Sequence, residues 1–120
     1  MSTTALFLAA ALLPAQAGDW RVITTTSDGT DTLVDGASIR RVGSVLTFWQ
    51  KDRHPDGTIE GARIRLDCHA NTWQILYQQI TDPGGRVVST LEKRLKPQDI
   101  RPGSAMEKER ARVCPVLVRD

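Results

Sequence analysis

The feature that most limits the fold of this chain is an alternation of apolar and polar residues with a period of two. In the segment 63–68, Ile64, Leu66 and Cys68 alternate with two arginines and an aspartate. Successive side chains of a β-strand point to opposite faces of a sheet, so this pattern predicts a strand with one face against a core and the other against water. The alternation recurs up to about residue 93, which favours a fold built mainly from strands.

Turn-forming residues divide this part of the chain into short strands. Strands are expected over residues 20–26, 32–35, 44–52, 63–68, 72–80 and 86–93. The segments 63–68 and 72–80 are separated by a short turn, so they are expected to form an antiparallel hairpin. The predicted fold class is therefore α+β, mainly β, with an antiparallel sheet of about five to six strands.

The alternation of apolar and polar residues with a period of two ends near the C-terminus, where a helix is expected. Ser104 and Glu107 fit the S-x-x-E capping box that begins many helices, and Pro115 cannot continue one. The helix is therefore expected from Ala105 to about Cys114. Val113 and Cys114 are expected on the face toward the sheet, whereas Glu109 and Arg112 are expected to face water and to pair at i, i+3.

The chain has two cysteines, Cys68 at the end of an expected strand and Cys114 at the end of the expected helix. An even count in an exported protein favours one disulfide. The alternative, a redox-active pair, lacks the C-x-x-C spacing typical of such sites. A bridge across a loop of this length would stabilise the fold by about 4 kcal/mol in the chain-entropy model, and it would link the helix to the sheet.

The N-terminal segment 1–17 has the pattern of a secretory signal peptide. Residues 5–13 are apolar throughout and are followed by Pro14 and the small-x-small sequence Ala15-Gln16-Ala17. The apolar run would span only about half of a bilayer as a helix, so no membrane span is expected. The protein is therefore expected to be exported, to the periplasm, the cell surface or the medium, with a mature domain over residues 18–120.

The charge balance and the polar motifs argue against several classes of function. The net charge is only +2, whereas nucleic-acid-binding domains carry concentrated positive charge. The chain has two histidines, and the pair Asp67 and His69 does not complete a metal shell once Cys68 is bridged. No nucleophile elbow and no phosphate-binding glycine loop is present. We therefore expect no enzymatic activity, no catalytic or metal-binding residues and no cofactor.

The aromatic residues point instead to a binding surface. Phe48 and Trp49 are neighbours on an expected strand, so they must face opposite ways. One helix can cover only one face of the sheet, and an uncovered apolar face favours a partner. Trp49 shares its face with Thr47 and Lys51, and these residues are the candidate interaction face. Self-association into a homodimer through the sheet is one form that this binding could take.

An ordered set of short motifs resembles the surface-adhesin protein E family of small exported bacterial proteins. The set runs from the N-terminus of the mature segment to its last cysteine and comprises Trp20, Val34-Asp35, Ser38-Ile39-Arg40-Arg41, the strand 43–49, Asp67-Cys68, Asp82-x-x-Gly85-Arg86-Val87-Val88, Pro102-Gly103-Ser104 and Val113-Cys114. The resemblance implies an antiparallel sheet with one helix held by a Cys68–Cys114 bridge. It also implies a non-catalytic domain, since the namesake of the family binds host matrix and plasma proteins.

Two functions are consistent with these observations. The first is a non-enzymatic envelope or surface protein of adhesin type that binds macromolecules, a surface-adhesin E-like domain over residues 18–120. The alternative is a periplasmic accessory or stress protein whose partner is another envelope component. Access of added protease to the protein on intact cells would separate the two.

Overall fold

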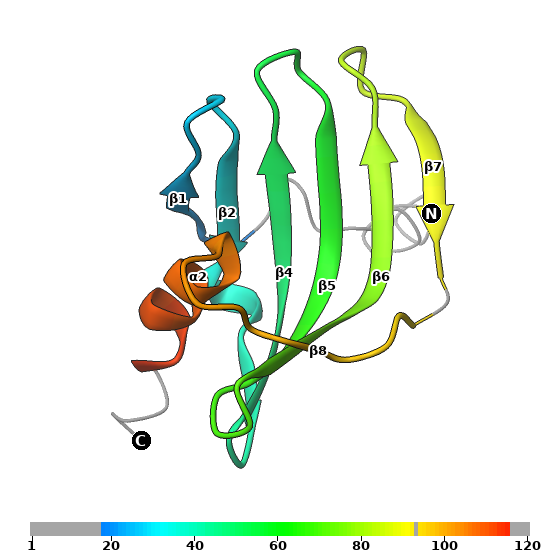
Figure 1. The fold of residues 1–120 in the computed structure, drawn as a ribbon. Helices are drawn as coiled ribbons and strands as arrows, with labels where there is room; N and C mark the ends of the chain where they lie inside the picture. Colours follow the sequence, from blue (N-terminus) through cyan, green and yellow to red (C-terminus); the bar gives the residue numbers. More distant parts are fainter. Residues whose placement is uncertain (1–17, 93, 116–120) are drawn as a thin grey trace.

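The structure of the chain, a computed structural model, describes residues 18–92 and 94–115 and shows a curved sheet with one helix against it (Figure 1). The strands are β1 (Trp20–Thr25), β2 (Asp31–Asp35), β3 (Arg40–Val42), β4 (Val45–Arg53), β5 (Ile59–Asp67), β6 (Thr72–Thr81), β7 (Val87–Leu91) and β8 (Gln98–Asp99). The helical elements are the 3-10 turn η1 (Gly36–Ser38) and the α-helix α2 (Ala105–Val113). The predicted signal peptide, residues 1–17, lies outside the described residues.

All strands belong to one antiparallel sheet of eight strands. Six of them follow the order β1-β2-β4-β5-β6-β7, and the short strands β3 and β8 pair with β4 and β6. The predicted antiparallel sheet with one C-terminal helix is confirmed. The six strands of the main path correspond to those expected from the alternation, whereas β3 and β8 have only three and two residues and are too short to show a period.

The predicted hairpin is formed by β5 and β6, which pair from Ile59 opposite Thr81 to Asp67 opposite Thr72. Its turn includes Asn71 at φ 61°, a left-handed conformation that asparagine tolerates better than most residues. The carbonyl of Asn71 accepts a 3.0 Å hydrogen bond from the backbone of Ile100, just after β8. This bond holds the segment that leads into the helix against the end of the hairpin.

The core lies on the helix side of the sheet and is centred on β4 and β5. Leu46 and Phe48 of β4 are fully buried, and Leu66 of β5 packs in the same cluster with Val113 of α2. Burial of each large apolar side chain stabilises the fold by roughly 1.5–3 kcal/mol. The predicted alternation on β4 is confirmed, because Phe48 faces this core and its neighbour Trp49 faces the other side.

Helix α2 begins where the capping box predicted. The Ser104 hydroxyl accepts a 3.2 Å hydrogen bond from the backbone of Glu107, and the Glu107 carboxylate accepts a 2.8 Å bond from the backbone of Gly103. The helix lies in front of the β1, β2 and β4 side of the sheet, while β5, β6 and β7 extend beyond it (Figure 1). Part of the helix-side face is therefore left open.

Candidate functional site

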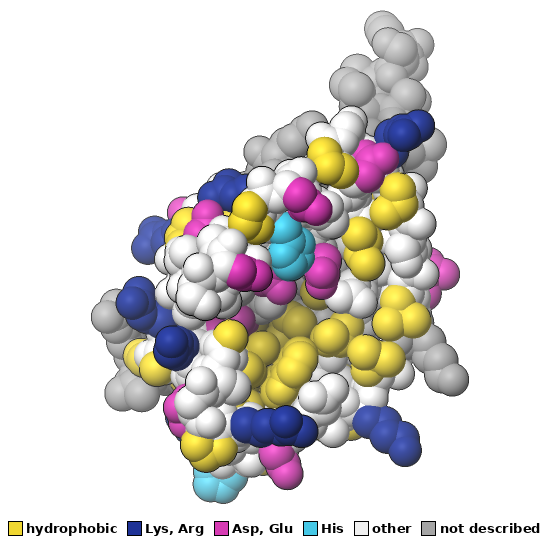
Figure 2. All heavy atoms as spheres, turned by 45° about the horizontal axis from the view of Figure 1, so that its top comes forward, with side chains coloured by type: hydrophobic (Ala, Val, Ile, Leu, Met, Phe, Trp, Pro, Cys, Tyr) yellow, Lys and Arg dark blue, Asp and Glu magenta, His cyan; other side chains and the backbone are white. Residues whose placement is uncertain are grey.

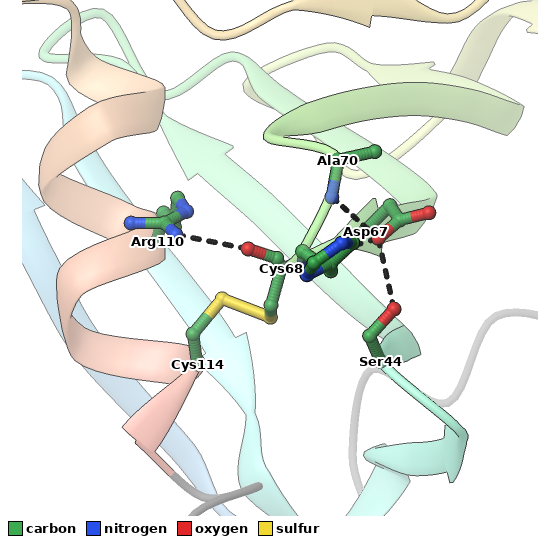
Figure 3. The surroundings of a disulfide bond; sticks show 7 residues. Ser44, Asp67, Cys68, Ala70, Arg110 and Cys114 are labelled. Atoms are coloured by element: carbon green, nitrogen blue, oxygen red, sulfur yellow. Dashed lines mark hydrogen bonds between the residues drawn. A yellow bond between two sulfur atoms is a disulfide. The ribbon is translucent and has the colours of Figure 1, made fainter.

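The disulfide between Cys68 and Cys114 joins the end of β5 to the end of α2, with a Cα–Cα distance of 5.9 Å (Figure 3). The predicted bridge is confirmed. Arg110, one helical turn before Cys114, donates a 2.9 Å hydrogen bond from its guanidinium to the Cys68 carbonyl. A covalent bond and a charged hydrogen bond therefore fix the C-terminal half of the helix to one corner of the sheet.

Asp67 and His69 flank Cys68 but do not form an acid–base pair. The Asp67 carboxylate accepts hydrogen bonds from the backbone of Ala70 at 3.0 Å and of His69 at 3.1 Å, and from the Ser44 hydroxyl at 3.0 Å (Figure 3). These bonds lower the pKa of Asp67, and the bond from Ala70 makes the largest contribution. The carboxylate therefore closes the turn of the hairpin, and its bonding capacity is used within the fold.

His54 lies in the turn between β4 and β5, between two polar partners. Its Nδ1 is 3.1 Å from the Thr30 hydroxyl, and its Nε2 is 3.0 Å from the carboxylate of Glu60. Within residues 18–92 and 94–115, no group of three or more His, Cys, Asp or Glu side chains is arranged to hold a metal ion. The absence of metal-binding residues and of catalytic activity stays a prediction.

The open part of the helix-side face forms a groove of about 530 Å³ between α2, β5, β6 and the β8 segment. Its floor and inner wall are apolar and comprise Ala62, Ile64, Trp73, Ile75 and Met106. Figure 2 shows this hollow with hydrophobic side chains inside, acidic side chains and a histidine along one border, and Lys or Arg side chains along the other. The volume lies within the range of about 300–1,000 Å³ that is typical of ligand pockets.

Glu109 corrects one prediction made from the sequence, because its side chain is buried in this groove and not exposed to water. It is only 3% exposed, whereas Arg112, its expected partner, is exposed. Glu109 follows Met106 by three residues and precedes Val113 by four, so all three share the helix face toward the sheet. The spacing of Glu109 from Met106 and Val113 indicates the face toward the sheet, but the polarity of glutamate led to the wrong prediction that it faces water.

The carboxyl group of Glu109 meets polar groups of β4 at the inner end of the groove. The amide group of Gln50 lies within hydrogen-bonding distance of both oxygens of Glu109, and with its nitrogen turned toward the helix it donates to them when Glu109 is ionised, at 3.0 Å to Oε1. Asp52, the next residue of β4 on this face, accepts a 2.7 Å hydrogen bond from the Thr32 hydroxyl. Two carboxyl groups thus lie near each other with amide and hydroxyl partners.

Burial changes the ionisation of both carboxyl groups. Desolvation, and to a smaller extent the charge of Asp52, raises the pKa of Glu109 to about 8. Desolvation is also the main cause that raises the pKa of Asp52. At neutral pH the buried Glu109 therefore holds its proton for most of the time, and it would ionise readily if a cation entered the groove.

The predicted interaction face, Thr47, Trp49 and Lys51, lies on the side of β4 away from the helix, and each of these residues is half-buried. The rings of Trp49 and Tyr77 form a T-shaped pair, with 5.9 Å between centroids and an interplanar angle of 80°. Lys51 places its ammonium 4.3 Å from the ring centre of Trp20. The three predicted residues are thus brought together on one face, and their role in binding stays a prediction.

This second face is a single layer of aromatic and cationic side chains. The guanidinium of Arg63 lies 5.5 Å from the ring centre of Trp49, and Tyr77 donates a 2.9 Å hydrogen bond to Gln79 on the same strand. Among the described elements, α2 is the one α-helix, and it packs on the opposite face. The face therefore presents large flat groups that are fixed by contacts with one another.

Comparisons with known proteins do not identify the chain. No family model matches it, and no curated protein or solved structure does so either. Among the described residues, no helix has the length and apolar character that crossing a membrane requires. The disulfide is typical of proteins in an oxidising compartment. The resemblance to the surface-adhesin protein E family stays a prediction.

Proposed function

We propose that this chain is a non-enzymatic exported envelope or surface protein that binds a macromolecular partner through the face of its sheet that carries Thr47, Trp49 and Lys51. The observation that carries the proposal is the set of contacts between aromatic and cationic side chains on that face, in which Lys51 lies over the ring of Trp20 and Arg63 lies near the ring of Trp49. The partner is a host matrix or plasma protein, or another component of the envelope.

The chemistry of the face supports binding to a large partner better than catalysis. Aromatic and arginine side chains are enriched at the centres of protein interfaces, and Trp49, Tyr77 and Arg63 contribute such groups from three adjacent strands. Rings that are already held by neighbours lose little conformational freedom on binding. A partner with acidic and apolar side chains would match the guanidinium and the rings.

Binding assays with a single charge reversal test the proposal. Wild-type protein and the Trp49→Glu variant are passed over immobilised matrix and plasma proteins, and over solubilised envelope fractions, while surface plasmon resonance records binding. The Ala70→Glu variant is the matched control, because it adds the same charge in an exposed turn. We expect Trp49→Glu to lose at least roughly tenfold in affinity, the equivalent of one interface residue worth about 1.4 kcal/mol, and Ala70→Glu to bind as the wild type does.

Two further measurements decide between the forms of the proposal. Sedimentation equilibrium shows whether the protein dimerises, and protease added to intact cells that express the full chain shows whether it is exposed. Digestion on intact cells favours a surface binder, and protection favours the periplasmic accessory protein. Equal binding by the wild type, Trp49→Glu and Ala70→Glu, together with a monomer at high concentration, would show that this face is not the interface.

A further inference from the structure

The groove beside α2 lies on the opposite face of the sheet from the surface invoked above, and it differs from it in charge. Five charged or ionisable side chains line it: Asp52 and Glu60 from β4 and β5, Glu109 from α2, and Asp99 and Arg101 from the β8 segment. Four of these carry carboxyl groups and one carries a guanidinium. The groove thus has an acidic excess within a protein whose net charge is +2.

We propose that this groove binds an amphipathic cation, a molecule or side chain with an alkyl body and an ammonium or guanidinium group. The alkyl body would lie on the apolar floor formed by Ala62, Ile75 and Met106, and the cationic group would lie at the inner end between Glu109 and Asp52. The site is independent of the proposed function, because its residues lie on the other side of the sheet.

The position of Glu109 is the observation that points to a cation and not to a neutral apolar ligand. The carboxyl group is buried, yet the structure has no ion pair to it within residues 18–92 and 94–115; its hydrogen-bond partner is the neutral amide of Gln50. A buried carboxyl group is costly unless it is paired or neutral. Without a partner charge Glu109 keeps its proton, whereas a ligand cation would pair with the ionised carboxylate, and the alkyl part of the ligand would displace water from the groove floor.

The other carboxyl groups that line the groove also favour a cation at its inner end. Asp52 accepts one hydrogen bond, from Thr32, and it lines the groove. Glu60 is partly occupied by His54, whose Nε2 is 3.0 Å from its carboxylate. The cation is therefore expected at Glu109 and Asp52, the inner pair, and not at the outer border.

The experiment titrates the folded, disulfide-bonded protein with hexylamine, and with hexanol and hexanoate as probes of equal length that lack the positive charge. Binding is followed by amide chemical shifts in two-dimensional NMR spectra. We expect hexylammonium to shift amides of α2, β5 and β6 around the groove, and to bind roughly tenfold or more tightly than hexanol, as one charged hydrogen bond would provide. Equal binding of hexylammonium and hexanol, or shifts outside the groove, would overturn the proposal.

Two variants distinguish binding in the groove from a general effect of the protein's charge. Each of them replaces one glutamate with glutamine. Glu109→Gln is isosteric and keeps an acceptor for Gln50, and it is expected to reduce affinity for hexylammonium by roughly tenfold. Glu92→Gln makes the same replacement at an exposed position outside the lining of the groove, and this variant is expected to bind as the wild type does. An equal loss in both variants would contradict a specific site. Ala105→Phe, which fills the mouth of the groove, should abolish binding and leave the fold intact.

The pH dependence of binding gives a readout that a structural role of Glu109 would not produce. The charged groups that line the groove with Glu109 are Asp52, Glu60, Asp99 and Arg101. Because Glu109 holds a proton when the groove is empty, a bound cation must displace it, so wild-type affinity should rise between pH 6 and about 8. This rise should be smaller in Glu109→Gln, and an identical pH profile in both proteins would count against the assignment.

A second arm distinguishes two sources of the same chemistry. The lysine side chain of a peptide and a free alkylamine both present an alkyl chain with an ammonium group. N-acetyl-lysine methylamide is therefore titrated beside hexylamine. Tighter binding of the lysine derivative identifies a partner protein as the source, tighter binding of hexylamine identifies a small amine, and failure of both probes to bind at millimolar concentration overturns the proposal.

Discussion

The two faces of the sheet use the same strands in different ways. On the helix side, β4 and β5 contribute Leu46, Phe48 and Leu66, which are completely buried. On the other side, the same strands contribute Trp49 and Arg63, which are half-buried and contact each other through a ring and a guanidinium. One face is thus closed by packing against a helix, whereas the other is covered only by its own side chains.

This difference follows from the length of the helix, because the one α-helix of the described residues covers only part of one face of the sheet. Helix α2 has nine residues, so it spans only about 14 Å and cannot cover six strands. The part that it covers forms the core, and the part beyond its edge forms the groove. The far face has amphipathic side chains: the rings of Trp49 and Tyr77 meet at nearly a right angle, and cationic groups lie over ring faces. We therefore expect the stability of the fold to depend mainly on the helix-side face, and binding to depend on both faces.

The largest expected effect is a charge placed on the helix-side face. Phe48→Glu removes a fully buried ring and buries a carboxylate, so it should destabilise the fold by more than about 5 kcal/mol and leave the domain unfolded. Trp49→Glu, the adjacent residue on the other face, should leave the domain folded. Urea denaturation followed by circular dichroism measures both. If Trp49→Glu unfolds the domain as well, the two faces do not differ in the way described.

The second largest effect is expected from the bridge that holds α2 on its face. The double variant Cys68→Ser, Cys114→Ser should lose about 4 kcal/mol of unfolding free energy, the loop-closure value for a loop of this length. The same loss should follow reduction of the wild type, which serves as its control. Intact-mass analysis with alkylation, before and after reduction, shows whether the two thiols are bonded in the protein isolated from cells. Labelling of both thiols without reduction would contradict the bridge.

The comparison of the two faces also shows what the sequence could predict. Alternation predicted the strands β4 and β5, and the adjacent positions of Phe48 and Trp49 predicted that they face opposite ways. Trp49 was assigned to the outer face because it shares that face with Thr47 and Lys51. The even number of cysteines predicted the bridge between Cys68 and Cys114. These features depend on local periodicity and composition, and they need no knowledge of how distant segments pack.

The groove and the burial of Glu109 could not be predicted in the same way. A glutamate in an otherwise charged helix is usually solvated, and its burial depends on where α2 crosses the sheet. That position is set by the disulfide and by the bond between Ile100 and Asn71, which join segments far apart in the chain. The strands β3 and β8 were not predicted because they have only three and two residues, and β8 also depends on pairing with the distant strand β6.

The third effect should appear only as the pH changes. Because the pKa of Glu109 is raised from 4.5 to about 8, the folded state keeps a proton that the unfolded chain has already released between these values. The unfolding free energy therefore falls as pH rises through this range and levels off above it. The total loss should be at most about 5 kcal/mol at 1.36 kcal/mol for each pH unit, and most of it falls between pH 5 and 8.

The Glu109→Gln variant isolates this contribution. Glutamine does not ionise, so the variant should gain stability relative to the wild type as the pH rises from 5 to 8, while the two proteins should be similar below the pKa of a free glutamate. Urea titrations at several pH values measure the difference. A difference that stays constant with pH would mean that Glu109 ionises normally, and the inner end of the groove would then be wetter than its burial indicates.

The smallest effect is expected on the far face, where side chains cover one another without a core. Lys51→Met removes the ammonium that lies 4.3 Å from the ring centre of Trp20 and keeps the aliphatic stem, so it should cost no more than about 1 kcal/mol, the value of a partly exposed cation–π contact. Lys108→Met, at an exposed position of α2, is the matched control and should be neutral. Urea denaturation of the two variants gives the difference. A loss of 3 kcal/mol or more, on the order of that for truncating a core residue, would mean that this face is a second packed core. Trp49 would then be a structural residue, and the partner of the domain would have to bind in the groove on the other side.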